Sequence, residues 1–302
     1  MRAQFYTADV FTDRPFGGNQ LAVFPDARGI DPAMMQNIAR EFNFSETTFV
    51  LPPTDPRHAA RVVIFTPGGE LPFAGHPTVG TAHVLSAIGQ VPLTGETTKI
   101  VLEEKVGPVP VSIRARDGKP VFVQLTAAQA PEVGPPAPSR EALAEMLSLP
   151  TDALRSGTWS PESVSCGVSF LFIPLVDRQA VASARLKLDS WGRTLGGYVT
   201  SMVFVFCEGG EQTGSQIHSR MFAPGIGIPE DPATGGAVVG LAGYLAARDA
   251  RTDGTLKWVV EQGFEMGRPS ILEAEADKRE GKVMITRVGG ASVLMTSGHL
   301  EF

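Results

Sequence analysis

The sequence predicts an α+β protein made of two similar halves, each a curved sheet wrapped around one central helix. Apolar segments of strand type outnumber helical patterns along the whole chain. The halves also share a repeat, because Phe65 and Phe222 each stand in an apolar strand that leads through a Pro-Gly turn into a helix. Both of these helices contain small and apolar residues with almost no charge in their first turns, as expected of helices that a sheet surrounds.

The expected strands are short, because 33 glycines and 24 prolines interrupt the chain throughout. Each is rich in β-branched or aromatic residues and is bounded by Gly, Pro or Asp. We expect strands at residues 4–11, 47–51, 60–66, 109–115, 120–126, 170–175, 201–206, 282–288 and 291–300.

Four segments have the composition and end residues of helices. Asp31 and Ser139 are predicted N-caps, because their side-chain oxygens can accept hydrogen bonds from the free N–H groups of a first turn. The other two helices carry Pro77 and Pro232 near their starts, where proline is tolerated. The four expected helices span residues 31–42, 76–89, 139–149 and 231–248. The repeat matches Pro67 with Pro224, Gly68 with Gly225, and Pro77 with Pro232.

A connection rich in Pro and Ala at residues 126–140 falls near the middle of the chain and is typical of an extended linker. We therefore predict two domains, at residues 1–126 and 127–289. This division agrees with the loose expectation of about 150 residues per domain.

Composition limits the class of protein. A net charge of −6 and a pI near 5.5 argue against nucleic acid as the main partner. No apolar run approaches the roughly 18 residues of a membrane span, and the N-terminus has no signal-peptide core. Cys166 and Cys207 have no metal-ligand spacing, and the chain has no nucleotide-binding or nucleophile-elbow motif. We expect a cytoplasmic protein with reduced thiols, no metal, no cofactor and no membrane partner.

The stretch IPEDPATGGA, residues 228–237, suggests where a ligand would bind. Asp231, followed by Pro232 and small residues, predicts a capped helix start, and the free N–H groups of such a start attract anions. His76 opens the matching helix of the first half. If the halves face each other, both helix ends point into the cleft between them, which predicts a binding site that attracts anions.

Glu46 is the strongest candidate for acid–base chemistry. Its neighbours Phe42, Phe44 and Phe49 are apolar, so its carboxyl is expected to be partly desolvated, with a raised pKa. The alternative for Glu46 is a strand-edge residue that is exposed to water or caps a turn. Asp231 could be a helix cap and nothing more, and His76 could cap a helix or donate a hydrogen bond to a substrate carboxylate.

Five motifs together resemble the PhzF-like phenazine-biosynthesis family, namely DVFTDRPFGGNQLAVF, FNFSETTFV, LPFAGHPTVGTAHVL, EDPATGGA and QGFEMGRPS. They run from residue 9 to about residue 270 in the family's order, so the resemblance covers essentially the whole chain. It implies the diaminopimelate-epimerase fold, in which two pseudo-symmetric domains with mostly antiparallel sheets enclose a site. It also implies that the final strand, at about residues 290–302, returns to the first domain, and that the protein is a homodimer.

The family's named activity is isomerisation of trans-2,3-dihydro-3-hydroxyanthranilate in a biosynthetic process, by moving a proton between two ring carbons without cofactor or metal. By this resemblance, the catalytic residues are Glu46, His76 and Asp231. The implied substrate-binding residues are Asn19, Ser45, Gly75, Thr234, Gly235 and Gly236.

Two departures from the family pattern bear on the substrate. Gly236 stands where the family usually has Ser after EDPATG, which removes a hydroxyl. Gln20 stands where the family usually has Pro after Gly18 and Asn19. Neither change touches the expected acid–base residues.

The leading hypothesis is therefore a cofactor-independent isomerase in which Glu46 moves a proton on a small carboxylated substrate. Two alternatives remain open: an amino-acid racemase or epimerase that uses carboxylates in place of paired thiols, and a non-catalytic binder of small carboxylates.

Overall fold

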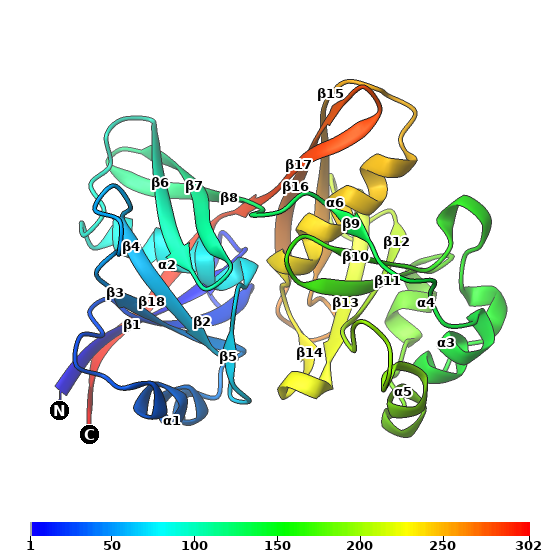
Figure 1. Cartoon of the computed structure of the whole chain (residues 1–302), viewed down its shortest axis with the longest axis horizontal. Coiled ribbons are helices and arrows are strands. Elements are labelled where there is room, and N and C mark those ends of the chain that lie inside the picture. The colour runs from blue at the N-terminus through cyan, green and yellow to red at the C-terminus, as the bar shows by residue number, and fades with distance from the viewer. Residues whose placement is uncertain (1) are drawn as a thin grey trace.

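The computed structural model describes residues 2–302 and has two lobes, each built around one helix (Figure 1). In the first lobe, sheet strands surround α2 (Gly75–Ala87), and in the second they surround α6 (Gly235–Arg248). Both helices are buried along almost their whole length. This arrangement confirms the predicted α+β class of two similar sheet-and-helix units.

The first lobe contains the N-terminal elements together with the last strand. Its elements are β1 (Arg2–Val10), β2 (Asn19–Phe24), α1 (Pro32–Phe42), β3 (Glu46–Leu51), β4 (Ala60–Phe65), β5 (Glu70–Leu71), α2, β6 (Thr97–Glu104), β7 (Gly107–Arg116), β8 (Lys119–Thr126) and β18 (Ser292–Glu301).

The second lobe contains the elements between β8 and β18. They are β9 (Glu132–Val133), α3 (Arg140–Leu147), β10 (Glu162–Ser165), β11 (Ser169–Pro174), α4 (Arg178–Ser183), α5 (Leu188–Leu195), β12 (Val203–Glu208), β13 (Ile217–Ala223), β14 (Ile228–Asp231), α6, β15 (Gly254–Gln262), β16 (Ser270–Arg279) and β17 (Lys282–Gly290).

Each sheet packs against helices on both of its faces, because some of its strands have apolar side chains on both sides. Successive side chains of a strand point to opposite faces of the sheet. In β11, Phe170 and Phe172 belong to the core around α6, whereas Leu171 and Ile173 belong to the core formed with α3, α4 and α5. The first lobe repeats this pattern with α2 inside and α1 outside.

The C-terminal strands cross between the lobes. β18 pairs antiparallel with β1, and the end of β17 pairs antiparallel with β8 of the first lobe. The linker predicted at residues 126–140 contains β9, which pairs with β10. The domain limits at residues 1–126 and 127–289 stay a prediction.

The predicted helices at residues 31–42 and 139–149 are confirmed, with Asp31 and Ser139 accepting capping hydrogen bonds from Met34 and Ala142. No helix among residues 2–302 is both long and apolar enough to cross a bilayer.

The predicted helix start at Asp231 is wrong. Asp231 is the last residue of β14, and α6 begins at Gly235 after the N-cap Thr234. The matched prolines therefore occupy different places, since Pro77 lies inside α2 and Pro232 lies before α6. The physical reason is that Asp231 is held in an extended segment by hydrogen bonds from other elements, so it caps no helix.

The N-termini of α2 and α6 meet between the lobes, and glycine makes this contact possible. A Cβ atom at Gly75 would lie 2.4 Å from the carbonyl carbon of Gly235 and 2.4 Å from the backbone nitrogen of Gly236. Any larger residue at position 75 would therefore push the helix ends apart.

We expect Gly75→Ala to lower the free energy of unfolding by about 1–3 kcal/mol, the usual range for overpacking. Gly236→Ala is the matched control, because its added Cβ would lie 3.6 Å from the ring of Phe170, an ordinary contact distance. Urea unfolding of both variants checks this expectation, and equal stability of the two would contradict the contact described here.

Candidate active site

A cavity of about 270 Å³ lies where the two helix ends meet. The acids Glu46 and Asp231 line it together with His76. Most of the remaining wall is apolar or backbone. It is formed by Leu71, Pro72, Phe73, Ala74, Gly75, Gly167, Val168, Phe170, Met202, Met221, Ile226, Ile228, Thr234, Gly235 and Gly236.

The structure brings all of the sequence-predicted site residues to this place. Two of them, Asn19 and Ser45, do not line the cavity but contact Asp231. The other seven lie in its wall, namely Glu46, Gly75, His76, Thr234, Gly235, Gly236 and Asp231.

Glu46 is a buried carboxyl with few partners. It is the first residue of β3 and is 5% exposed, so the alternative of an exposed edge residue is wrong. Its Oε2 accepts no hydrogen bond from any residue that the structure describes. Burial raises the pKa of Glu46 well above its ordinary value, and the charge of Asp231 raises it further.

Asp231 is equally buried but well provided with donors. Its Oδ1 accepts hydrogen bonds from Asn19 at 2.8 Å and Ser45 at 2.9 Å, and its Oδ2 accepts one from Thr234 at 2.6 Å. Burial raises the pKa of Asp231 to about 6, against the lowering effect of these three bonds. The two acids therefore differ: burial raises the pKa of both, but only Asp231 has side-chain hydrogen bonds that lower its pKa.

Asn19 connects the two lobes at the site. It begins β2 of the first lobe, and its amide nitrogen lies 2.8 Å from Asp231 Oδ1 and 3.0 Å from the carbonyl oxygen of Ala233 in the second lobe. The same nitrogen lies 3.1 Å from Nδ1 of His76. The neighbouring side chain of Gln20 is exposed, so this departure from the family pattern lies outside the cavity.

His76 is a neutral imidazole beside Glu46. Its Nε2 lies 3.3 Å from Glu46 Oε2 and makes no hydrogen bond within the described chain. Burial lowers the pKa of His76 to about 3, against the raising effect of a hydrogen bond with the backbone of Gln20. Because the imidazole of His76 is neutral, its contact with Glu46 is not an ion pair.

Gln262 is a site residue that the sequence did not reveal. It ends β15 with no exposed surface, and its amide donates to the carbonyl oxygen of Asp231 at 2.7 Å and to Thr234 Oγ1 at 2.9 Å. Its Oε1 accepts from the backbone N–H of Thr234 at 3.0 Å. Gln262 thus fixes the turn between Asp231 and α6. Its only sequence signal was a place in the QGFEMGRPS motif.

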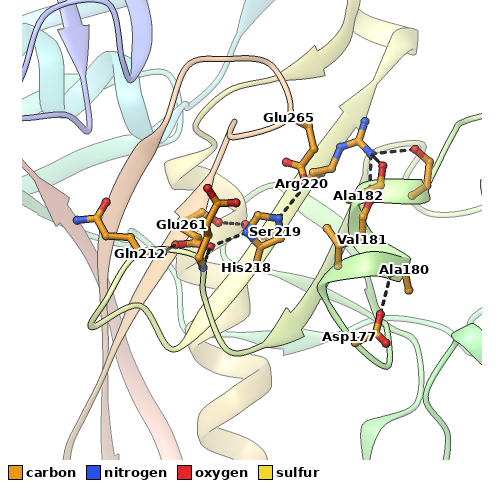
Figure 2. A network of polar contacts seen from close by, with 12 residues as sticks. Asp177, Ala180, Val181, Ala182, Gln212, His218, Ser219, Arg220, Glu261 and Glu265 are labelled. Carbon is orange, nitrogen blue, oxygen red and sulfur yellow. Dashed lines mark hydrogen bonds and ion pairs between the residues drawn. The ribbon is translucent and has the colours of Figure 1, made fainter.

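A network of polar contacts connects β13 to the end of β15 and to the loop after Gln262 (Figure 2). His218 lies between Glu261 at 2.6 Å and Glu265 at 2.8 Å. Burial alone would lower the pKa of His218, but its bonds to the two carboxylates raise it to about 9, so the imidazole is charged at neutral pH. From the same loop, Arg268 donates to the carbonyl of Gly18, directly before Asn19.

The adjacent acids Glu230 and Asp231 point to different surroundings. Glu230 forms a two-bond ion pair with the buried Arg220, at 2.8 and 2.9 Å. Arg220 also donates to carbonyl groups at the end of α4, including that of Val181 (Figure 2). Only Asp231 therefore faces the cavity.

The cysteines do not take part in the site. Burial raises the pKa of Cys166 to about 11 and that of Cys207 to about 12, and neither thiol lines the cavity. Among residues 2–302, no cluster of three or more His, Cys, Asp or Glu side chains has the arrangement of a metal site.

Comparison with known proteins gives consistent matches. Residues 8–298 match the PhzC-PhzF family, described as phenazine biosynthesis-like protein. The chain is 34% identical to the trans-2,3-dihydro-3-hydroxyanthranilate isomerase of Pseudomonas aeruginosa, over 98% of each chain. It is 39% identical to an uncharacterised isomerase of Mesorhizobium japonicum, over 97% of this chain and 96% of that protein. A phenazine biosynthesis protein of the PhzF family from Bacillus anthracis superposes with a TM-score of 0.88 at 25% identity, over all of both chains.

The burial of Glu46 makes stability depend on pH. Above its ordinary pKa of 4.5, the unfolded carboxyl ionises while the folded one keeps its proton, so the folded state loses stability as pH rises. We expect the free energy of unfolding of wild type to fall relative to that of Glu46→Gln between pH 4.5 and 7. Urea unfolding at several pH values measures this difference. The control is Glu41→Gln on the exposed end of α1, which should follow wild type; the same behaviour of Glu46→Gln would contradict the raised pKa.

Proposed function

This chain belongs to the PhzC-PhzF family and is an isomerase of that family, and from that premise we propose that it moves a proton between two carbons of a small cyclic carboxylate. Glu46 is the proposed acid–base group. In its ionised form it takes a proton from one carbon, and in its protonated form it then donates a proton to another carbon as the double bonds shift; exchange of the carboxyl proton with solvent between these steps brings deuterium into the ring in D₂O. The reaction consumes no other reactant.

The observation that carries this proposal is the contrast between the two acids in one cavity. Asp231 has three hydrogen-bond donors and a pKa of about 6, whereas Glu46 Oε2 has no hydrogen-bond donor among residues 2–302. Environments that separate the pKa values of neighbouring acids are typical of acid–base sites. An acid whose pKa is raised towards neutrality can both accept and donate a proton near pH 7.

We propose that the substrate carboxylate binds at the two helix ends. The N–H groups of Gly75, Gly235 and Gly236 lie at the positive ends of α2 and α6, and these positions line the cavity. Of the described residues, no Lys or Arg lines it, so the helix ends are the available anion-binding groups. Asp231 and His76 would orient the polar substituents beside the carboxylate.

The apolar wall favours a compact ring. Phe170, Met202 and Met221 face the cavity and offer no hydrogen-bonding groups comparable to those of the acids. The substrate that the Pseudomonas aeruginosa relative's name gives, trans-2,3-dihydro-3-hydroxyanthranilate, combines one carboxylate with such a ring, and we propose it or a close analogue for this chain. At Gly236, an added Cβ would lie 3.6 Å from the ring of Phe170, an ordinary contact distance, so the position has room for the Cβ of the serine that is usual in the family.

The remaining expectations belong to the same proposal: a cytoplasmic protein, active as a homodimer, without nucleic acid or membrane partners. Light scattering of the purified protein tests the dimer directly.

We expect Glu46→Gln to lower turnover by about 10²–10⁴-fold, because a glutamine cannot carry the proton. The measurement is NMR in D₂O with trans-2,3-dihydro-3-hydroxyanthranilate, which reports both isomerisation and deuterium entering a ring carbon. Glu41→Gln is the matched control and should keep wild-type turnover.

Wild-type turnover by Glu46→Gln would refute the assigned role. Binding without any exchange in wild type would instead favour the non-catalytic binder, and exchange that racemises amino acids would favour the racemase.

A further inference from the structure

Glu104 is a buried acid that the proposed reaction does not use. It ends β6 at the turn into β7 and is 7% exposed. Its Oε2 accepts no hydrogen bond from the part of the chain that the structure describes. Its Oε1 lies 2.5 Å from the hydroxyl of Thr78, in the first turn of α2. This contact connects β6 to the helix whose N-terminus enters the cavity.

The hydroxyl of Thr78 faces two acceptor oxygens but has only one hydrogen. Its Oγ1 lies 2.7 Å from the carbonyl oxygen of Ala74 and 2.5 Å from Glu104 Oε1. An ionised Glu104 would compete with the carbonyl for that hydrogen, whereas a protonated Glu104 supplies a hydrogen of its own. Both contacts are satisfied together only when Glu104 is protonated. Burial supports this state, because it raises the pKa of Glu104 to about 8, against the lowering effect of the Thr78 bond.

The charged groups on the surrounding elements are bound to other partners, neutral or exposed. On α2, burial lowers the pKa of His76 to about 3 and that of His83 to about 4, so neither carries a positive charge near pH 7. Three more charged groups lie near Glu104. Arg61 is exposed on β4, and Lys105 pairs with Glu70 at 3.3 Å. Glu103 accepts hydrogen bonds from the backbone of Thr54 and Asp55 and contacts His58.

The turn that carries Glu104 is fixed to the wall of the cavity. The N–H of Val106 donates to the carbonyl oxygen of Pro72 at 2.9 Å. The side chain of Val106 also approaches Gly167 of the second lobe, where an added Cβ would lie 3.4 Å from it. Because Pro72 and Gly167 both line the cavity, a movement of this turn away from α2 would disturb that wall.

The Ala74 carbonyl and the Gly75 N–H belong to one peptide unit, and Gly75 opens α2 at the cavity. We propose that protonated Glu104 is a positioning residue for this peptide unit: Glu104 donates to Thr78, Thr78 donates to the Ala74 carbonyl, and the Gly75 N–H is held and polarised toward the substrate carboxylate. Hydrogen bonds in such a chain strengthen one another. The inference rests on the proposed function, which places that carboxylate at Gly75.

Selective labelling observes this peptide unit directly. The sequence contains the step Ala–Gly only at Ala74–Gly75 and Ala242–Gly243. Protein labelled with [1-¹³C]alanine and [¹⁵N]glycine therefore gives two HNCO signals, and the pair inside α6 is an internal control. We expect the Ala74 carbonyl signal of wild type to shift between pH 6 and 9 with a midpoint near 8, while the Ala242 signal stays constant.

Two variants test whether ionisation of Glu104 causes the shift of the Ala74 carbonyl signal. Glu104→Gln donates to Thr78 at every pH, so its Ala74 signal should not titrate. Thr78→Val removes the relay and should leave that signal near its high-pH position throughout. A constant wild-type signal from pH 6 to 9 overturns the proposal. So does the same titration in Glu104→Gln, because Glu46 would then be its source.

A binding measurement tests the consequence for the carboxylate. The probe is 3-hydroxyanthranilate, and 2-aminophenol is the control that lacks only the carboxylate. We expect the affinity of wild type for 3-hydroxyanthranilate to fall by about tenfold between pH 6.5 and 9, the effect of one weakened charge-assisted hydrogen bond. Glu104→Gln should fall by less, and the affinity for 2-aminophenol should be alike in both proteins.

The labelling experiment and the binding measurement distinguish a failure of this inference from a failure of the proposed function. Failure of wild type to bind 3-hydroxyanthranilate at pH 6.5 counts against the proposed function, and the labelled carbonyl still decides whether Glu104 acts on Ala74. Equal pH dependence of 3-hydroxyanthranilate binding in wild type and Glu104→Gln overturns the positioning role.

Discussion

The contact between the N-termini of α2 and α6 is the constraint on which the site depends. Two helix ends with partial positive charge meet at Gly75 and Gly235. A Cβ atom on Gly75 would collide with the opposite backbone, and one on Gly235 would make a tight contact with it, at 3.0 Å. Such an arrangement is electrostatically unfavourable by itself and is relieved by anions. The ionised Asp231 supplies one beside the contact, and the free N–H groups create a place for another. Each helix is buried in the sheet of its own lobe, which holds its N-terminus in place.

The division of roles between the acids follows from how the lobes supply hydrogen-bond donors. Asn19 and Ser45 reach Asp231 from the first lobe, while Thr234 reaches it from the second. Glu46 Oε2 receives no hydrogen bond from the described residues, so nothing offsets the effect of burial, which raises the pKa of Glu46. Asp231 therefore serves both as a charged group in the site and as a bond between the lobes. Asn19 also donates to the carbonyl oxygen of Ala233, so the hydrogen bonds that hold Asp231 are part of the contact between the lobes.

The sequence predicted the features that depend on local patterns and missed those that depend on distant partners. Caps such as Asp31, the apolar strands and the two small-residue helices have local causes, and the structure confirms them. The predicted start of α6 was wrong, because an acid followed by proline looks like a helix cap in the local sequence. The residues that hold Asp231 in an extended segment include Asn19, which is 212 positions away. Gln262 gave no local signal, since its partners belong to the turn at Thr234. The roles of the site residues stay predictions from the resemblance.

The most direct test of the account is a crystal structure of Glu46→Gln with trans-2,3-dihydro-3-hydroxyanthranilate, since the inactive variant should retain the substrate. The account predicts the carboxylate within hydrogen-bonding distance of the Gly75 N–H and of a backbone N–H at Gly235 or Gly236. It also predicts a ring carbon within about 3.5 Å of the side chain at position 46, the distance that proton transfer requires. A carboxylate bound away from the helix ends, or a ring out of reach of position 46, would contradict it.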